Sequence, residues 1–366
     1  MVGPVGRRVT AAMVARRAGT SVSTVSLVVN GKSRGRVSAV ITDRVRAAVD
    51  ELGYVVDHAA SSLARGTTDL VVLLAPDLPN PYFGRVTTGI REALGSRHPL
   101  MLSVIEGGEQ PGADDVRRVA AFRPAGLLVH APSPTFLDDL EPGGPPMVLM
   151  DAPGFESRAA TVTFDLEPGV RALVAHLAAA GHTTIAYLEG STPSATFTVR
   201  RELLSRVAAA HGLRVLDDGT RAGLTLDSAA DVSAEALPRW RAGGATAVVA
   251  AADTMAYGVL AAAHRLGLDV PGDIAVAGFD DLPYSQVTAP ALTSVALPAE
   301  ELGRAAAQRL AGCSPRRRLR RVAPPAVRPG GPGQHRRLIP GPRASACERP
   351  SRRSVPEAAS GPAGQR

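Results

Sequence analysis

The sequence predicts two kinds of fold in one chain: a small all-α head with a helix-turn-helix pattern, and a two-lobed α/β body with parallel sheets. Residues 10–53 contain three short helical patterns separated by turns that contain glycine. From Leu70 onward, short apolar runs alternate with amphipathic stretches of helical length, which is typical of a parallel sheet covered by helices on both faces. The body is long for a single sheet, so we expect two sheets with a cleft between them.

The head is predicted as three helices over residues 11–18, 21–29 and 38–52. Ser21 is a favourable N-cap for the second helix, and Gly53 ends the third. Two helices joined by a tight turn, with a third packed behind them, form the helix-turn-helix pattern.

The body is predicted from runs of strand length and stretches of helical periodicity. The expected strands are Leu70–Ala75, Leu100–Ile105, Gly126–His130, Met147–Met150, Thr161–Phe164, Thr184–Leu188, Ala247–Ala251 and Ile274–Gly278. The expected helices are Phe83–Leu94, Asp114–Phe122, Pro168–Ala180, Thr198–His211, Ser228–Arg241, Thr254–Leu266 and Ala299–Leu310.

Basic residues are concentrated at the two ends of the chain. The formal net charges of residues 1–66, 67–312 and 313–366 are +6, −10 and +11. A basic helical head on an acidic body predicts that the head meets nucleic acid and that the body does not. The last segment is rich in Arg, Pro, Gly and Ser without aliphatic periodicity, so we expect either a disordered tail or the product of a shifted reading frame.

The composition argues against several classes of protein. No run of about eighteen apolar residues is present, so we expect no membrane span. The charged first residues are not followed by an apolar segment, so we expect no secretory signal. Cys313 and Cys347 are the only cysteines and have no metal-ligand spacing. We therefore expect a cytoplasmic protein without a metal or cofactor.

The second helix of the head is the candidate for reading DNA bases. Its first turn points at base edges in a helix-turn-helix, where Val22 suits a thymine methyl and Ser23 and Ser26 suit bases or phosphates. Val25 and Val28 are expected to face the small core of the head instead.

The segments Val9–Gly31, Arg44–Tyr54 and Ala59–Ala64 resemble the lactose-repressor (LacI/GalR) family, and the resemblance extends to about residue 310. It implies a dimeric regulator on palindromic operator DNA and a periplasmic-binding-protein-like body. It also implies a hinge helix whose Leu63 wedges into the minor groove. The chain departs from the family at Leu27, where an Arg is usual, since leucine cannot make the bidentate contact with guanine.

These considerations divide the chain into four parts. We expect a DNA-binding domain over 1–57, a hinge helix over 58–66, an effector-binding and dimerisation domain over 67–312, and the tail over 313–366. The candidate DNA-binding residues are Ser21, Val22, Ser23, Thr24, Ser26, Leu27, Asn30, Lys32, Arg36, Tyr54, Ala60 and Leu63.

The loops that follow the predicted strands carry the candidate effector site. Asp77 suits sugar hydroxyls, and the aromatic rings of Tyr82 and Phe83 suit either stacking on a sugar or packing in the core. Arg200 stands where the family grips hydroxyls or a carboxylate, for which a planar guanidinium is suited. Ala252 replaces an Asn that is usual in the family. The candidate effector-binding residues are Asp77, Tyr82, Phe83, His130, Arg200, Asp253 and Asp280.

The leading prediction is a homodimeric, sequence-specific repressor of carbohydrate-utilisation genes that a small sugar-like effector relieves. One alternative is a constitutive repressor with an incomplete effector domain, and another is a pure sugar-binding protein. A further alternative is an enzyme, because the paired carboxylates of Asp280 and Asp281 could hydrolyse a glycoside. No other feature supports catalysis, so we do not expect an enzyme and name no catalytic residue.

Overall fold

The computed structural model describes residues 9–54, 66–76, 80–105, 109–312 and 328–329. Several predictions lie outside these residues: the hinge helix apart from Gly66, with Ala60 and Leu63; the loop residue Asp77; and the tail apart from Arg328–Pro329.

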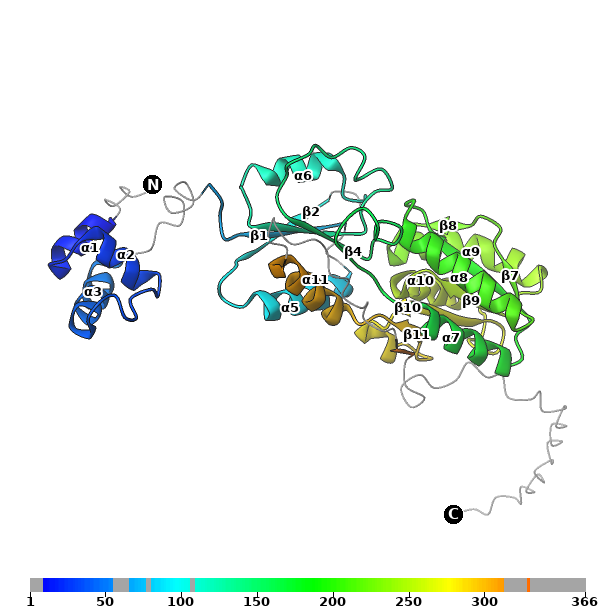
Figure 1. The fold of residues 1–366 in the computed structure, drawn as a ribbon. Coiled ribbons are helices and arrows are strands. Elements are labelled where there is room, and N and C mark those ends of the chain that lie inside the picture. The colour runs from blue at the N-terminus through cyan, green and yellow to red at the C-terminus, as the bar shows by residue number, and fades with distance from the viewer. Residues whose placement is uncertain (1–8, 55–65, 77–79, 106–108, 313–327, 330–366) are drawn as a thin grey trace, which may run out of the picture.

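The head contains the three predicted helices. They are α1 (Ala11–Ala18), α2 (Val22–Val29) and α3 (Ala39–Leu52) (Figure 1). Each begins at a hydroxyl side chain that accepts a hydrogen bond from the backbone N–H three residues on, and for α2 this residue is Ser21. Val14, Val25 and Val45, one from each helix, are fully buried together. The prediction that Val25 and Val28 face this core is confirmed.

The first lobe is a five-stranded parallel sheet in the order β2-β1-β3-β4-β5. Its strands are β1 (Val71–Ala75), β2 (Leu100–Val104), β3 (Gly126–His130), β4 (Met147–Met150) and β5 (Thr161–Val162). Helices α5 (Pro81–Leu94) and α11 (Ala299–Gly312) cover one face, and α6 (Ala113–Ala120) covers the other (Figure 1). Successive residues of β1 therefore enter two different apolar clusters, Leu73 on one face and Leu74 on the other.

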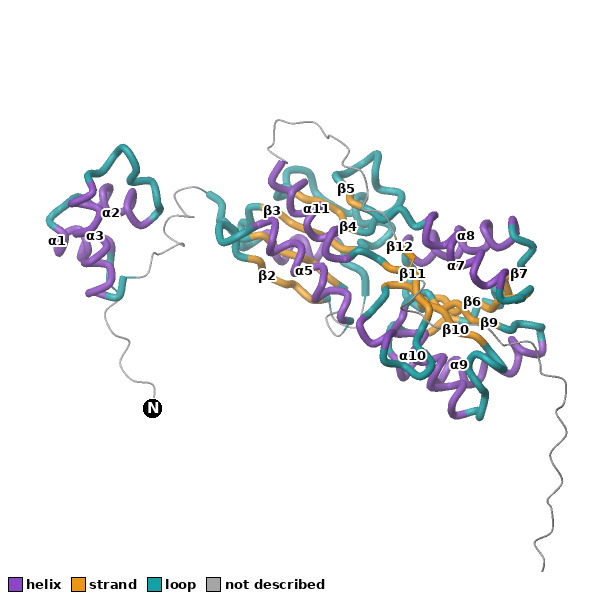
Figure 2. Tube along the Cα trace, turned by 90° about the horizontal axis from the view of Figure 1, so that it is seen from below, coloured by secondary structure: helices purple, strands orange, loops and turns teal. Residues whose placement is uncertain are grey.

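The second lobe contains a sheet in the order β12-β11-β10-β9-β6-β7, with β8 pairing on β6. Its strands are β6 (Thr184–Gly190), β7 (Arg214–Leu216), β8 (Arg221–Ala222), β9 (Ala247–Ala250), β10 (Ala275–Asp280), β11 (Thr293–Ala296) and β12 (Arg328–Pro329). Its helices are α7 (Glu167–Ala179), α8 (Ala195–Ala210), α9 (Leu226–Ala242) and α10 (Asp253–Arg265). The pair α7 and α8 lies on one side of the strands and the pair α9 and α10 on the other (Figure 2).

All the predicted strands and helices of the body are present, with ends that differ by no more than three residues. The prediction missed β7, β8, β11 and a 3₁₀ turn at Pro283–Gln286, because segments of two to four residues are too short to show periodicity. It was also wrong about part of the tail, since Arg328–Pro329 pairs antiparallel with β11.

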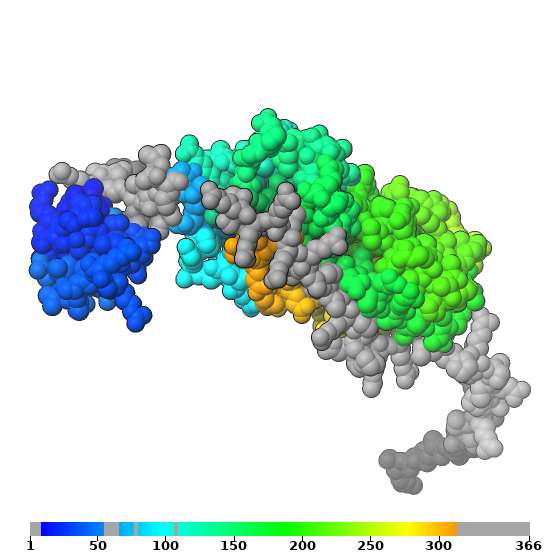
Figure 3. Space-filling view, in the orientation of Figure 1, coloured from blue at the N-terminus to red at the C-terminus, as the bar shows by residue number. Residues whose placement is uncertain are grey.

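Helices α5 and α11 come from opposite ends of the body sequence and pack closely (Figure 3). Two glycines permit this approach. A Cβ at Gly89 would overlap the carbonyl group of Glu300, and a Cβ at Gly303 would overlap that of Val86. Backbone therefore lies against backbone, where no flexible side chain can move aside.

We expect Gly89→Ala to lower the free energy of unfolding by about 2–3 kcal/mol, because the added methyl must push the two helices apart. Gly84→Ala on the same helix is the matched control, since no atom lies within 4 Å of its added Cβ. That change should be neutral or stabilise the protein by up to about 1 kcal/mol, because alanine favours the helix. Urea unfolding of both variants measures the difference, and equal stabilities would contradict the close packing.

Candidate functional site

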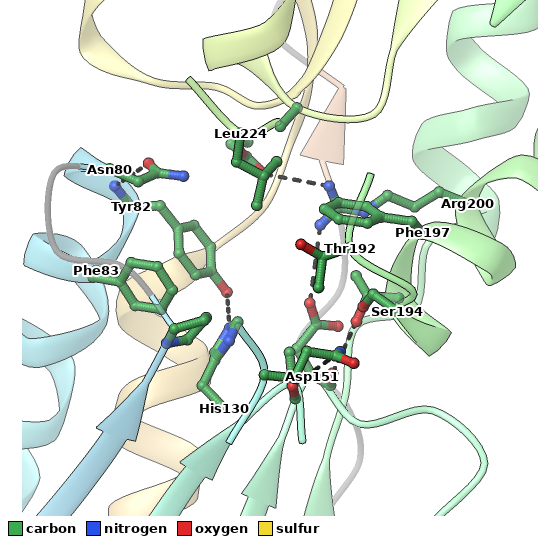
Figure 4. A pocket seen from close by; sticks show the side chains of 16 residues that line it. Asn80, Tyr82, Phe83, His130, Asp151, Thr192, Ser194, Phe197, Arg200 and Leu224 are labelled. Atoms are coloured by element: carbon green, nitrogen blue, oxygen red, sulfur yellow. Dashed lines mark hydrogen bonds and ion pairs between the residues drawn. The ribbon is translucent and has the colours of Figure 1, made fainter. Parts of the chain in front are cut away.

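A cavity lies between the two lobes and encloses about 650 Å³, including its open mouth (Figure 4). The first lobe contributes Pro76, Asn80, Tyr82, Phe83, Gln110, His130, Ala131 and Asp151. The second lobe contributes Thr192, Ser194, Thr196, Phe197, Arg200, Leu224, Ala252 and Asp280.

The sheet topology explains why the cavity forms at this place. In the first lobe β1 lies between β2 and β3, so the connection from β2 to β3 crosses over β1, and in the second lobe β6 is flanked in the same way by β7 and β9. Such switch points leave a crevice outside the carboxyl ends of the strands. Pro76 follows β1 and Ala252 follows β9, so both crevices open into the cavity.

Three strand ends at the cavity have a left-handed backbone although none is glycine. The φ angles are 44° at Ala131, 46° at Asp151 and 111° at Asp280. A non-glycine residue in such a conformation costs about 1–3 kcal/mol and persists only where its surroundings hold it. The packed sheets therefore fix the direction in which these ends of the strands turn.

Arg200 is the central charged group of the cavity and is only 4% exposed. Its Nη2 lies 3.9 Å from Oδ2 of Asp151 in the first lobe, and its Nη1 lies 3.6 Å from Oδ1 of Asp280 in the second (Figure 4). The same Nη1 donates a 2.6 Å hydrogen bond to the carbonyl oxygen of Ala251. The guanidinium thus links both lobes from α8.

Two aromatic rings hold the guanidinium in place. Its Cζ lies 5.8 Å from the ring centroid of Phe197 and 5.2 Å from that of Phe279, within the range of cation–π attraction. Its Nε is buried and has no hydrogen-bond partner.

Burial is the largest influence on the pKa values of the titratable groups Asp151, Asp280 and His130 that line the cavity. It raises the pKa of Asp280 and of Asp151, and the charge of Arg200 partly offsets this rise. Burial, and secondly the charge of Arg200, lowers the pKa of His130 to about 3, so this imidazole is neutral near pH 7. Among these lining groups, two carboxylates therefore face one guanidinium.

Tyr82, Phe83 and His130 form an edge-to-face cluster on the first-lobe wall. The centroid of His130 is 5.5 Å from that of Tyr82 and 5.0 Å from that of Phe83. The Tyr82 hydroxyl is 3.3 Å from Nε2 of His130. Tyr82 and Phe83 are buried in the core and also line the cavity, and their stacking on a sugar stays a prediction.

Asp253 does not lie on the cavity, and its predicted contact with the effector has no support here. The side chain is fully buried and accepts hydrogen bonds from the Leu282 backbone N–H at 2.9 Å and from the hydroxyls of Ser285 and Ser294 at 2.7 Å. Asp253 therefore links the start of α10 to the segment that follows β10 and to β11 itself.

The predicted set of effector-binding residues omits several that line the cavity, chiefly Asp151, Thr196 and Phe197. Asp151 carried a recognisable signal because it directly follows an apolar strand. Thr196 connects the lobes, since its Oγ1–H donates a 3.0 Å hydrogen bond to the backbone oxygen of Asp151. Phe197 carried no such signal, because an aromatic residue in a helix is usually part of the core.

In the head, the predicted DNA-binding residues gather mainly on the exposed surface of α2 and the turn after it. Val22 is 49% exposed, and Ser23, Ser26, Lys32 and Arg36 are also exposed. The remaining described candidates are exposed or half-buried, and Tyr54 packs partly against the core of the head. Their contacts with DNA stay predictions.

A helix-turn-helix head and a two-lobed body with a polar pocket define a class of ligand-responsive DNA-binding proteins. The family described as "Bacterial regulatory proteins, lacI family" matches residues 10–57, and the "Periplasmic binding protein-like domain" matches residues 174–331. The second match extends beyond residue 310, where the predicted resemblance ended, and includes β12.

Known relatives span most of the chain. The transcriptional regulator reg1 of Streptomyces lividans is 32% identical over 323 residues, covering 81% of this chain and 88% of the relative. GalR of Escherichia coli (strain K12) is 31% identical over 301 residues, covering 81% and 86%. The chain belongs to the LacI family and is a sequence-specific DNA-binding transcriptional regulator.

Solved structures agree with this assignment. The lac repressor dimer bound to operator and the anti-inducer ONPF matches with a TM-score of 0.70 and 26% identity, over 83% of this chain and 92% of that one. The complex of the regulator CelR with cellobiose matches with a TM-score of 0.59 and 27% identity, over 87% and 96%.

The described residues contain neither a membrane-spanning helix nor a group of metal ligands. In that part of the chain, no helix has the length and apolar character needed to cross a membrane. The same residues contain no group of His, Cys, Asp and Glu side chains arranged to hold a metal ion.

We expect Arg200→Met to lower the free energy of unfolding by about 3 kcal/mol near pH 7.5, because it leaves two buried carboxylates without their cation. A carboxyl whose pKa is raised by folding destabilises the folded state as the pH rises from about 3.9, its unfolded pKa, through the folded pKa. The loss of stability of Arg200→Met relative to the natural sequence should therefore become smaller as the pH falls towards about 5. Removing the charge of Arg200 also relieves part of the lowering of the His130 pKa, which lessens the cost of this neutral imidazole at low pH and acts in the same direction.

The matched control is Arg201→Met, because Arg201 pairs with Glu189 and Asp217 away from the cavity. Its effect should stay below about 1 kcal/mol, because Arg201 is partly exposed and the buried Glu189 keeps its ion pair with Arg221. Urea unfolding at both pH values measures each variant. A deficit for Arg200→Met that does not change with pH would contradict the charge assignment.

Proposed function

We propose that the protein is a cytoplasmic, homodimeric repressor whose grip on a palindromic operator is relieved by a small sugar-like effector bound between the lobes. The observation that carries the effector proposal is the arrangement of Asp151, Arg200 and Asp280 across one cavity. Carboxylates accept and guanidinium groups donate hydrogen bonds, so together they complement adjacent hydroxyls.

The walls of the cavity support the same ligand class. Phe83 and Phe197 line it from opposite lobes, and aromatic rings suit the apolar faces of a sugar ring. The names of the relatives point in this direction, since they include a ribose operon repressor and a regulator in complex with cellobiose. Ala252 lines the cavity without a polar group, so the polar side chains that the second lobe offers a ligand are Arg200, Asp280 and the hydroxyls of Thr192, Ser194 and Thr196.

The switch rests on contacts that join the lobes. Arg200 approaches Asp151, Thr196 donates to the backbone of Asp151, and Arg85 of the first lobe donates a 3.2 Å hydrogen bond to the backbone oxygen of Asp281. A ligand that contacts both walls can favour one arrangement of the lobes over another. It does so only to the extent that its affinity for the two arrangements differs. The hinge predicted over 58–66 would pass this change to the head.

The cavity favours a responsive repressor over the constitutive alternative, because both lobes supply charged and aromatic groups to it. It also favours binding over glycoside hydrolysis. Asp280 is close to Arg200, whereas Asp281 does not line the cavity and its backbone N–H donates to the Ser294 hydroxyl. We therefore propose ligand binding, and not catalysis, as the role of this cavity.

The effector proposal predicts a selective loss of response in Arg200→Met. A panel of mono- and disaccharides is titrated into the full-length protein on an operator that has been selected from random duplexes. We expect at least one sugar to weaken operator binding by about 5- to 150-fold, the usual range of allosteric coupling. Arg200→Met should bind the operator and lose the response, whereas Arg201→Met should keep it.

No response to any sugar in the natural sequence would favour the constitutive alternative. Loss of the response in both arginine variants would instead place the effect outside the cavity.

The dimer proposal rests on the edge of the first sheet. Leu102 and Val104 project from the edge strand β2 on one face and are 41% and 40% exposed. An apolar edge of this kind is a surface for a second copy. The solved lac repressor that matches this chain is a dimer on its operator.

We expect Leu102→Glu to shift sedimentation towards the monomer and to weaken operator binding at least tenfold, since each half-site then binds separately. Leu266→Glu is the control, because Leu266 is equally exposed, at 42%, and lies in the second lobe. It should remain dimeric. A Leu102→Glu protein that stays fully dimeric would exclude β2 from the interface.

A further inference from the structure

The outward face of α2 consists of two pairs of residues four positions apart. Val22 and Ser26, both exposed, form one pair, and the exposed Ser23 and the half-buried Leu27 form the other. Val25 lies on the opposite, buried face. Each ridge of the face that points away from the head thus carries one aliphatic and one hydroxyl side chain.

The hydroxyls at the start of this face are already engaged within the head. Oγ of Ser21 accepts the backbone N–H of Thr24 at 3.1 Å and caps the helix. The same oxygen is 2.8 Å from Oγ of Ser23 and 2.9 Å from Oγ1 of Thr24. These contacts hold the three hydroxyls against one another at the start of the helix, and each hydroxyl keeps only part of its hydrogen-bonding capacity for a base.

The hydroxyl in the next turn is engaged as well. Nδ2 of Asn30 donates to the backbone oxygen of Ser26 at 2.8 Å and to its Oγ at 3.2 Å. This contact also fixes the amide of Asn30 at the end of the helix.

No residue from Val22 to Val29 carries a charge or an amide. The cations that follow the helix, Lys32, Arg34 and Arg36, are exposed in the turn. A cation in such a turn suits the phosphate backbone, which positions a protein without reading sequence. On this face of α2 the hydroxyls are thus partly engaged within the head, whereas the aliphatic side chains have no polar group to engage.

We propose that Val22 and Leu27 read the operator half-site through the C5-methyl groups of thymine, and that α2 makes no bidentate contact with guanine. The proposal rests on the DNA-binding function described above. The thymine methyl is the only apolar group that a base pair presents in the major groove. The expected half-site therefore contains A·T pairs at the positions under α2.

The test removes single methyl groups from the DNA and leaves the protein intact. Full-length protein first selects its sites from a random duplex library, and each thymine of the selected palindrome is then replaced by uracil. We expect one or two positions in each half-site at which the affinity falls about three- to fivefold, the value of one buried methyl group. Uracil at the other positions should have little effect.

Protein variants assign each methyl to its side chain. Val22→Ala should lower affinity for the selected site and abolish the effect of uracil at one position, and Leu27→Ala should do so at another. Val40→Ala is the matched control and should change affinity less than about twofold, because Val40 is an exposed aliphatic side chain of the head that lies on α3. Ser23→Ala tests the alternative that the hydroxyls of α2 read the bases. Thermal unfolding checks that each head remains folded.

The outcomes separate this inference from the function on which it rests. A selected palindrome whose affinity does not respond to uracil, or that Ser23→Ala weakens more than tenfold, overturns reading by methyl groups and leaves the regulator in place. Invariant guanines under α2 overturn it too. Binding without any sequence preference would overturn both.

Discussion

The body depends on one cation held between two carboxylates from different lobes. Asp151 follows a strand of the first sheet and Asp280 ends a strand of the second, so their approach to Arg200 requires both sheets to meet at their carboxyl ends. Buried charges of one sign are unfavourable unless a partner offsets them. Arg200 is therefore at once a structural link between the lobes and the group that an entering polar ligand meets.

The surroundings make this cation rigid. Its guanidinium is bonded to the Ala251 carbonyl and lies near the rings of Phe197 and Phe279, while the two acidic strand ends are held in left-handed conformations. A group fixed in this way loses little conformational entropy when a ligand binds. More of the free energy of its interaction with the ligand therefore contributes to affinity. The rigidity of the strand ends also transmits a change in one lobe to the other.

The elements of both domains could be predicted from the sequence because caps and periodicity are local signals. Ser21 and Gly53 mark helix ends wherever the rest of the protein lies. The cavity was predicted less completely, because the direction of a side chain depends on distant residues. Asp253 and Asp151 both follow apolar strands, yet Asp253 turns towards hydroxyls 32 and 41 positions away in the chain, and Asp151 turns into the cavity. Local sequence does not distinguish these two directions.

With bases read through methyl groups as proposed, the head would divide affinity and specificity between different residues. The cations beyond α2 would contact phosphates through charge, and the contribution of such contacts falls as salt is added. Aliphatic contacts with methyl groups carry no charge and are screened little. A head built in this way distinguishes operators by a few apolar contacts, each of small energy, and a single half-site gives limited discrimination. Two heads on one palindrome double that discrimination energy, which explains physically why an α2 without charged side chains requires a dimeric body.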